Sequence, residues 1–127
     1  MSATKTRANK IANVVIPVAD QDRAVEFYTD LGFEMRVDIP FGGQYRWIEV
    51  GFPGESTTIA LAPPPEGAPV GKRETGVTLQ TDDIDAYHAQ LREAGVDVDA
   101  EISRMGDPVP PMFWFRDPEG NTLLVVQ

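Results

Sequence analysis

Two stretches of the chain share one pattern of apolar and polar positions. Residues 13–34 align without a gap on residues 76–97, and each stretch begins with a short apolar run that is typical of a strand. An aspartate, Asp20 or Asp83, follows each run and can cap the helix that the next apolar spacing indicates. A glycine near the end of each stretch can terminate that helix. The chain therefore contains a predicted strand and helix in duplicate.

Three further strand-like runs follow each predicted helix. They span 33–39, 44–51 and 56–62 in the first half, and 96–103, 111–116 and 121–127 in the second. Each half is therefore β-α-β-β-β. This pattern favours an α+β fold of two βαβββ modules over a ferredoxin-like sandwich, which does not account for three strands after each helix. We expect curled mixed sheets that form a cup with the helices on the outside.

The length of 127 residues fits one domain preceded by a tail. Residues 1–10 are predicted to be a flexible basic tail, and residues 11–127 a single domain. Within the domain we place module 1 at about 11–62, a linker rich in proline and glycine at 63–71, and module 2 at about 74–127.

The net charge of the chain restricts the classes of molecule that we expect it to bind. The formal net charge is −9, and because three of the 11 basic residues lie in the first ten positions, the remainder carries −12. Phosphate groups would be repelled, so we expect no nucleic-acid or membrane partner. The absence of cysteine excludes disulfides and thiolate ligands. No apolar run is long enough to span a membrane and no secretory signal is evident, so we expect a soluble cytoplasmic protein.

Three segments resemble the vicinal oxygen chelate superfamily, which includes glyoxalase I, bleomycin-resistance proteins and extradiol dioxygenases. They are VVIPVADQDRAVEFYTDLGF (14–33), TDDIDAYHAQLREAGV (81–96) and FRDPEGNTLLVV (115–126). The resemblance extends over residues 11–127. It implies paired βαβββ modules and a homodimer, but it does not specify an activity. Whether the sheets pair within one chain or between two chains stays open.

The resemblance also indicates where a metal would bind. In metal-using members, four ligands, generally His, Glu or Gln, come from the first and last strands of the two modules. The matching positions here are Asn13, Ala60, Gly76 and Leu124, of which only Asn13 has a side-chain donor. A divalent ion needs several oxygen or nitrogen ligands, so we expect no metal and no cofactor. The only histidine, His88, is predicted to lie on the exposed face of its helix.

Strand alternation predicts which side chains face the cup. If Asn13 points inward, alternate residues of the other strands join it, Thr58 and Val126 among them. Alternation does not say which side of 111–116 faces inward. The candidate ligand-binding residues are Asn13, Val15, Trp47, Glu49, Ala60, Thr78, Gln80, Phe113, Trp114 and Leu124.

This lining predicts a metal-free protein that binds a small apolar or aromatic molecule, since an apolar concavity with few polar groups suits such a ligand. An ordinary core has a similar composition. The alternative is an enzyme: a lyase, isomerase or hydrolase with Glu49 as base, or a glyoxalase- or dioxygenase-type catalyst with a displaced metal. A structural or partner-binding role is the third interpretation. Glu49 would then pair with Arg46 or Arg116, or point to solvent.

Overall fold

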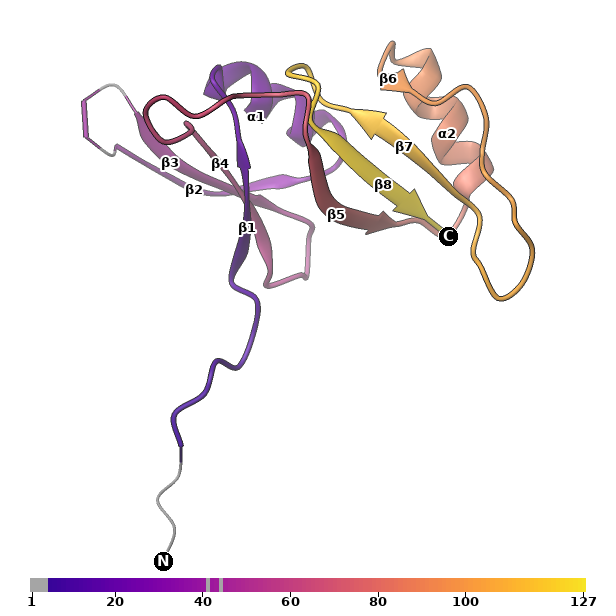
Figure 1. The fold of residues 1–127 in the computed structure, drawn as a ribbon, viewed down its shortest axis with the longest axis horizontal. Helices are drawn as coiled ribbons and strands as arrows, with labels where there is room; N and C mark the ends of the chain where they lie inside the picture. Colours follow the sequence, from indigo (N-terminus) through magenta and orange to yellow (C-terminus); the bar gives the residue numbers. More distant parts are fainter. Residues whose placement is uncertain (1–4, 41, 44) are drawn as a thin grey trace, which may run out of the picture.

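Two four-stranded sheets make up the protein, and each carries one helix on one face (Figure 1). The computed structural model describes residues 5–40, 42, 43 and 45–127. The elements of the first half are β1 (Asn13–Pro17), α1 (Gln21–Asp30), β2 (Glu34–Pro40), β3 (Arg46–Gly51) and β4 (Thr58–Ala62). Those of the second half are β5 (Glu74–Gln80), α2 (Ile84–Glu93), β6 (Asp97–Val98), β7 (Met112–Arg116) and β8 (Thr122–Val126). The predicted α+β fold of two βαβββ modules is confirmed.

The two sheets have the same mixed topology. The strand order is β1-β4-β3-β2 in the first sheet and β5-β8-β7-β6 in the second. In both, the first strand runs parallel to the last strand of its module, and the remaining neighbours are antiparallel. The repeat in the sequence is therefore a repeat in space, with the two sheets side by side and residues 5–12 extending away from them (Figure 1).

Both helices begin at the predicted aspartates. The Asp20 side chain accepts a hydrogen bond from Arg23 N at 3.0 Å, and the Asp83 side chain accepts one from Ala86 N at 3.0 Å. Each helix packs one face on its sheet, and the core lies between them. In the described part of the chain, no helix is both long and apolar enough to cross a membrane.

His88 lies in the core, so its predicted place on the helix surface was wrong. It is 8% exposed, and its ring packs edge-on against Phe113 with the centroids 4.9 Å apart. Its Nε2 lies 2.7 Å from the carbonyl oxygen of Asp99. The physical reason is helical spacing: His88 follows Ile84 by four residues and precedes Leu91 by three, and both of these are buried.

The strand expected at 96–103 is interrupted. β6 has only two residues, and pairing with β7 resumes at an isolated bridge between Ser103 and Met112. Asp99 N donates to the carbonyl of Trp114. The four steps from Asp99 to Ser103 therefore lie opposite only two steps of β7, from Trp114 to Met112. The extra residues bulge out of the sheet and shorten the strand.

Candidate ligand-binding site

Each sheet has one face that its helix leaves uncovered, which we call the helix-free face. Residues paired directly across neighbouring strands share a face. Val15 pairs with Ala60, and Ala60 with Glu49, so these three lie together on the first sheet's helix-free face. The same logic places nine of the ten candidate residues on the two helix-free faces: Asn13, Val15, Trp47, Glu49 and Ala60 in the first sheet, and Thr78, Gln80, Trp114 and Leu124 in the second. Their role in binding stays a prediction.

Phe113 is the exception. Its side chain is fully buried on the helix side of the second sheet, where it contacts the rings of Tyr87 and His88. Its neighbour Trp114 pairs with Leu124 on the helix-free face and is only partly buried. In the segment 111–116, the side that carries Trp114 therefore lies on the helix-free face. Phe113 is removed from the candidate site because α2 covers it.

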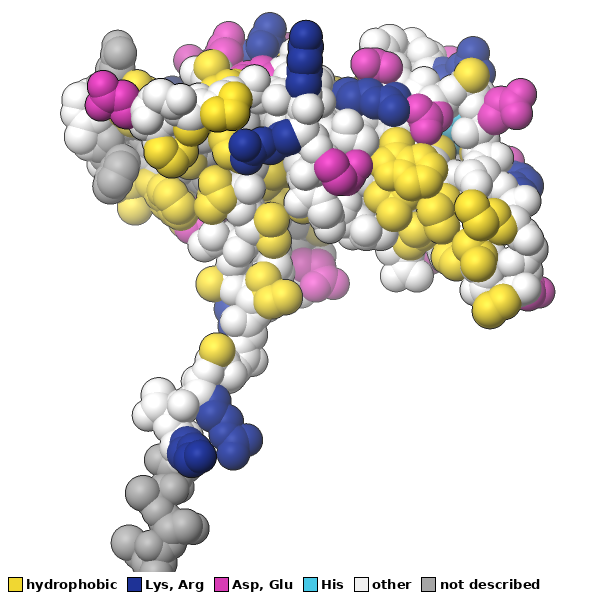
Figure 2. All heavy atoms as spheres, in the orientation of Figure 1, with side chains coloured by type: hydrophobic (Ala, Val, Ile, Leu, Met, Phe, Trp, Pro, Cys, Tyr) yellow, Lys and Arg dark blue, Asp and Glu magenta, His cyan; other side chains and the backbone are white. Residues whose placement is uncertain are grey.

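The helix-free face of the second sheet is mainly apolar. Met112, Trp114, Leu124 and Val126 alternate onto it, and each is partly exposed. Figure 2 shows hydrophobic side chains gathered over β7 and β8, and α2 lies to one side of these strands in Figure 1. One chain leaves this surface in contact with solvent, which costs free energy unless a ligand or another protein surface covers it.

On the first sheet, two hydrogen bonds hold the carboxylate of Glu49. Trp47 Nε1 donates to Oε2 at 2.7 Å, and Thr58 Oγ1 donates to Oε1 at 2.6 Å. The bond from Thr58, followed by that from Trp47, lowers the pKa of Glu49 below its ordinary value, and partial burial opposes this shift only in part. Glu49 is therefore ionised at neutral pH.

The alternative pairing of Glu49 with an arginine is not found. The guanidinium of Arg46 lies 2.7 Å from the carboxylate of Asp22, on the helix side of the first sheet. That of Arg116 lies 2.7 Å from the carboxylate of Asp99 in the second module. Sequence reasoning placed Thr58 inward but did not identify it as a partner of Glu49, because a strand pattern does not reveal which side chains bond across the sheet.

A cleft of about 650 Å³ lies where the two modules meet. Val14, Phe33 and Phe52 line it from the first module, and the rings of Phe33 and Phe52 are stacked with centroids 4.0 Å apart. Thr78 and Gln80 line it from the second. The other candidate residues lie outside this cleft, so one chain does not enclose all of them in one cavity.

The positions that the resemblance assigns to metal ligands do not fit a divalent ion. Ala60 and Leu124 have hydrocarbon side chains, Gly76 has none, and Asn13 offers a neutral amide. Gly76 has φ +76° at a register shift of β5, and a Cβ there would meet open space. Its backbone conformation therefore requires glycine. Among the residues that the structure describes, no three His, Cys, Asp or Glu side chains are grouped to hold a metal.

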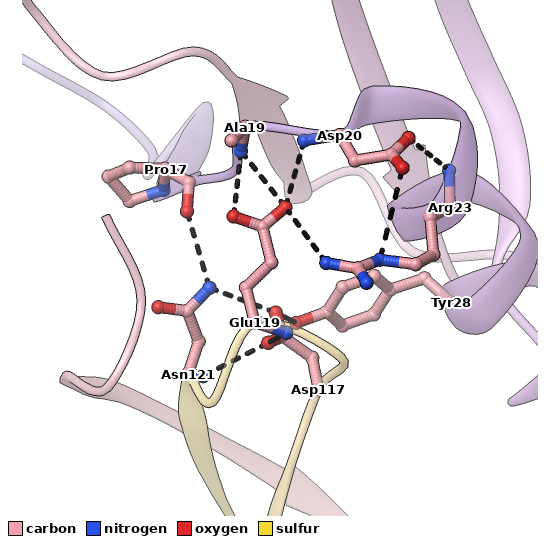
Figure 3. A network of polar contacts seen from close by, with 8 residues as sticks. All are labelled: Pro17, Ala19, Asp20, Arg23, Tyr28, Asp117, Glu119 and Asn121. Atoms are coloured by element: carbon pink, nitrogen blue, oxygen red, sulfur yellow. Dashed lines mark hydrogen bonds and ion pairs between the residues drawn. The ribbon is translucent and has the colours of Figure 1, made fainter.

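The turn between β7 and β8 connects the modules (Figure 3). The Glu119 carboxylate accepts hydrogen bonds from Ala19 N at 2.7 and 2.9 Å and from Asp20 N at 2.9 Å, just before α1. The Glu119 side chain is only 8% exposed, whereas the backbone donors belong to exposed residues. The sequence predicted a tight turn here but gave no signal that Glu119 reaches the other module.

A second part of this junction is formed by three buried side chains. Tyr28 OH donates to Asp117 Oδ2 at 2.9 Å, and Asn121 Nδ2 donates to the same oxygen at 3.0 Å and to the carbonyl of Pro17 at 3.2 Å. Burial, and then the charge of Asp117, raise the pKa of Tyr28, which stays a hydroxyl donor. The D-P-E-G-N segment at 117–121 therefore holds the two modules together through hydrogen bonds and lies apart from the helix-free faces.

Comparisons with known proteins agree with this architecture. The family model of the Glyoxalase/Bleomycin resistance protein/Dioxygenase superfamily matches residues 10–125. The structure of TnmS3, an antibiotic binding protein from Streptomyces sp. CB03234, is 32% identical with a TM-score of 0.82, over 97% of this chain and 98% of that one. A superfamily member from Sphaerobacter thermophilus DSM 20745 is 32% identical with a TM-score of 0.84, over 94% and 97%. The metallothiol transferase FosB of Shouchella clausii (strain KSM-K16) is 25% identical over 92% of this chain and 79% of its own length.

The chain belongs to the glyoxalase/bleomycin resistance protein/dioxygenase superfamily, because the family model spans nearly its whole length. That family contains both binding proteins and enzymes, so the fold does not decide between them. The choice between a binding protein and an enzyme therefore depends on the chemistry of the helix-free faces.

Proposed function

We propose that the protein binds a small, largely apolar or aromatic molecule in a cup formed by helix-free sheet faces, without a resident metal. The observation that carries the proposal is the makeup of these faces: partly exposed apolar side chains such as Trp114 and Leu124, with few polar groups among them. A surface of this kind gains from desolvation and from dispersion contacts with an apolar ligand. The name of TnmS3 as an antibiotic binding protein supports the same class of function.

A homodimer completes the proposed cup. Both helix-free faces keep exposed or partly exposed side chains in the described part of one chain, and Val15 on the first is 49% exposed. β1 and β5 are edge strands of their sheets, with one side free of backbone pairing to another strand of the described chain. A second copy would cover these edges and place another apolar surface against each face, which explains how a ligand can be enclosed.

The enzyme alternative is less well supported by the geometry. FosB is named a transferase, and a catalyst on this scaffold without a metal would need a base such as Glu49. The hydrogen bonds from Thr58 and Trp47 lower the pKa of Glu49, so its carboxylate accepts a proton only weakly at neutral pH. The same bonds fix the side chain in place, which suits recognition of a ligand.

Native mass spectrometry combined with elemental analysis tests the proposal. We expect a dimer of the 13.9 kDa chain and substoichiometric Mg, Mn, Fe, Co, Ni and Zn. We also expect the dimer to retain a co-purifying small molecule or to take up added aromatic compounds. A monomer with one metal ion per chain that takes up no aromatic compound would contradict the proposal and favour a metalloenzyme.

A further inference from the structure

The helix-free face of the first sheet contains an ionised group in a mainly apolar setting. Glu49 lies next to Ala60, which is fully buried, and in the same cross-strand row as Val15. A charge on a partly buried surface of this kind is costly unless a partner of opposite charge or several hydrogen bonds stabilise it. The partners of Glu49 therefore indicate what the face is suited to bind.

Both partners of the carboxylate are neutral. Trp47 Nε1 and Thr58 Oγ1 each donate one hydrogen bond, which orients the two oxygens but leaves the negative charge in place. Each oxygen keeps a second acceptor site, because a carboxylate can accept about four hydrogen bonds in total. Glu49 is thus oriented and retains acceptor capacity.

Two cations near this region, Lys10 and Arg36, do not form an ion pair with Glu49. Lys10 of the N-terminal arm acts on it only through longer-range attraction. The guanidinium of Arg36, which lies against Gly51 on the same face, is bound to the Glu34 carboxylate and to two backbone carbonyls. Within the described chain, none of the ion pairs includes Glu49.

We propose that Glu49, held by Trp47 and Thr58, is the specificity-determining residue of the cup and binds the ammonium group of a cationic aromatic ligand. This inference rests on the proposed function, since it concerns the same site. The ligand's ammonium group supplies Glu49 with an ion-pair partner and fills the free acceptor positions of the carboxylate. The indole of Trp47, fixed by the same bond, offers a π surface to the ligand. The net charge of −12 on residues 11–127 also attracts a cation.

Three compounds with one aromatic body test the inference: 1-naphthylmethylamine, which is cationic at neutral pH, neutral 1-naphthalenemethanol and anionic 1-naphthylacetate. Calorimetric titration of the full chain should rank the amine first, the alcohol second and the acetate last. Binding of the amine should weaken as salt rises from about 20 to about 300 mM, while that of the alcohol should not. This ranking is measured on the unaltered protein and needs no variant.

Glu49→Gln then identifies the residue, because the amide keeps the size and one acceptor oxygen but removes the charge. The amine should bind about tenfold or more weakly to this variant, while the alcohol should stay within about twofold. Asp38→Asn is the matched control. It removes the same charge from the neighbouring strand β2, where Asp38 contacts Arg46 on the helix side. The preference for the amine should survive this change.

The outcomes separate the inference from the proposed function. Equal affinity for the three compounds, or an amine affinity that Glu49→Gln leaves unchanged, would overturn the role of Glu49 while binding itself still stands. Failure of all three compounds to bind at millimolar concentration would overturn the proposed function and the inference together.

Discussion

Strand β3 shows how single residues divide between binding and packing. Ile48 and Val50 are fully buried against α1, whereas Trp47 and Glu49 alternate onto the helix-free face. Alternation along one strand therefore stabilises the core on one side and presents two hydrogen-bonding groups on the other. The hydrogen bonds of Trp47 and Thr58 orient the Glu49 carboxylate there and leave each of its oxygens one further acceptor position.

The depressed pKa of Glu49 gives a prediction for stability. Its folded pKa lies below the ordinary value of 4.5, so the folded state favours the ionised form more than the unfolded state does. The resulting stabilisation is present above pH 4.5 and is lost as the pH falls through the lower, folded pKa. We expect Glu49→Gln to lower the free energy of unfolding by about 1 kcal/mol at pH 7, allowing for partial exposure.

Urea unfolding of both proteins at several pH values measures this effect. The difference between them should shrink as the pH falls below about 4, where native Glu49 also becomes protonated. A difference that is the same at neutral and acidic pH would mean that the bonds from Thr58 and Trp47 do not depend on the charge.

Sequence pattern predicted residue positions only where polarity alternates. It assigned Val15, Ala60 and Leu124 to the face on which they lie, because strands around them have a clear register. It could not separate Phe113 from Trp114, since a run of adjacent aromatic residues has no polarity contrast. The left-handed backbone of Gly76 was also invisible, because a glycine in a strand is compatible with several conformations.

At the scale of elements, the N-terminus of α1 is held from the other module. Glu119 of the β7–β8 turn accepts three backbone hydrogen bonds at this point, about one hundred residues away along the chain. A carboxylate at a helix N-terminus also interacts favourably with the helix dipole. The contact therefore fixes the orientation of α1 against the second module.

Replacing Glu119 should weaken this connection. We expect Glu119→Ala to lower the free energy of unfolding by about 2 kcal/mol, because two backbone donors at the start of α1 lose a charged acceptor. Glu119→Gln, which keeps one oxygen, should cost less. Thermal or urea unfolding measures both, with Glu93→Gln on the exposed end of α2 as the control. If the alanine variant is as stable as the control, the contact contributes little.

The repeated elements were predictable because capping and periodicity are local. Asp20 and Asp83 indicated where both helices begin, and the apolar runs indicated most strands of the two sheets. The partner of Glu119 was not predictable, since a contact between distant segments depends on how the modules pack. The short β6 also escaped prediction, because the bulge after Asp99 depends on pairing with β7.

At the scale of the whole molecule, the duplicated modules leave two helix-free faces that differ in chemistry. The first presents Glu49 and Trp47, and the second presents Trp114 with apolar neighbours. We propose that a second copy of the chain joins these faces into a cup that takes an aromatic cation. The repeat itself was visible in the sequence, but the arrangement of two chains is beyond what one chain's pattern encodes.

The chain has two tryptophans, one on each helix-free face, so the two indole N–H resonances in a ¹H–¹⁵N NMR spectrum report directly on the proposed cup. Titration with 1-naphthylmethylamine should shift both resonances with the same apparent Kd, and Trp47→Phe and Trp114→Phe should assign them. Binding that shifts neither resonance, while backbone signals around Val14 and Phe33 in the inter-module cleft move instead, would contradict the account.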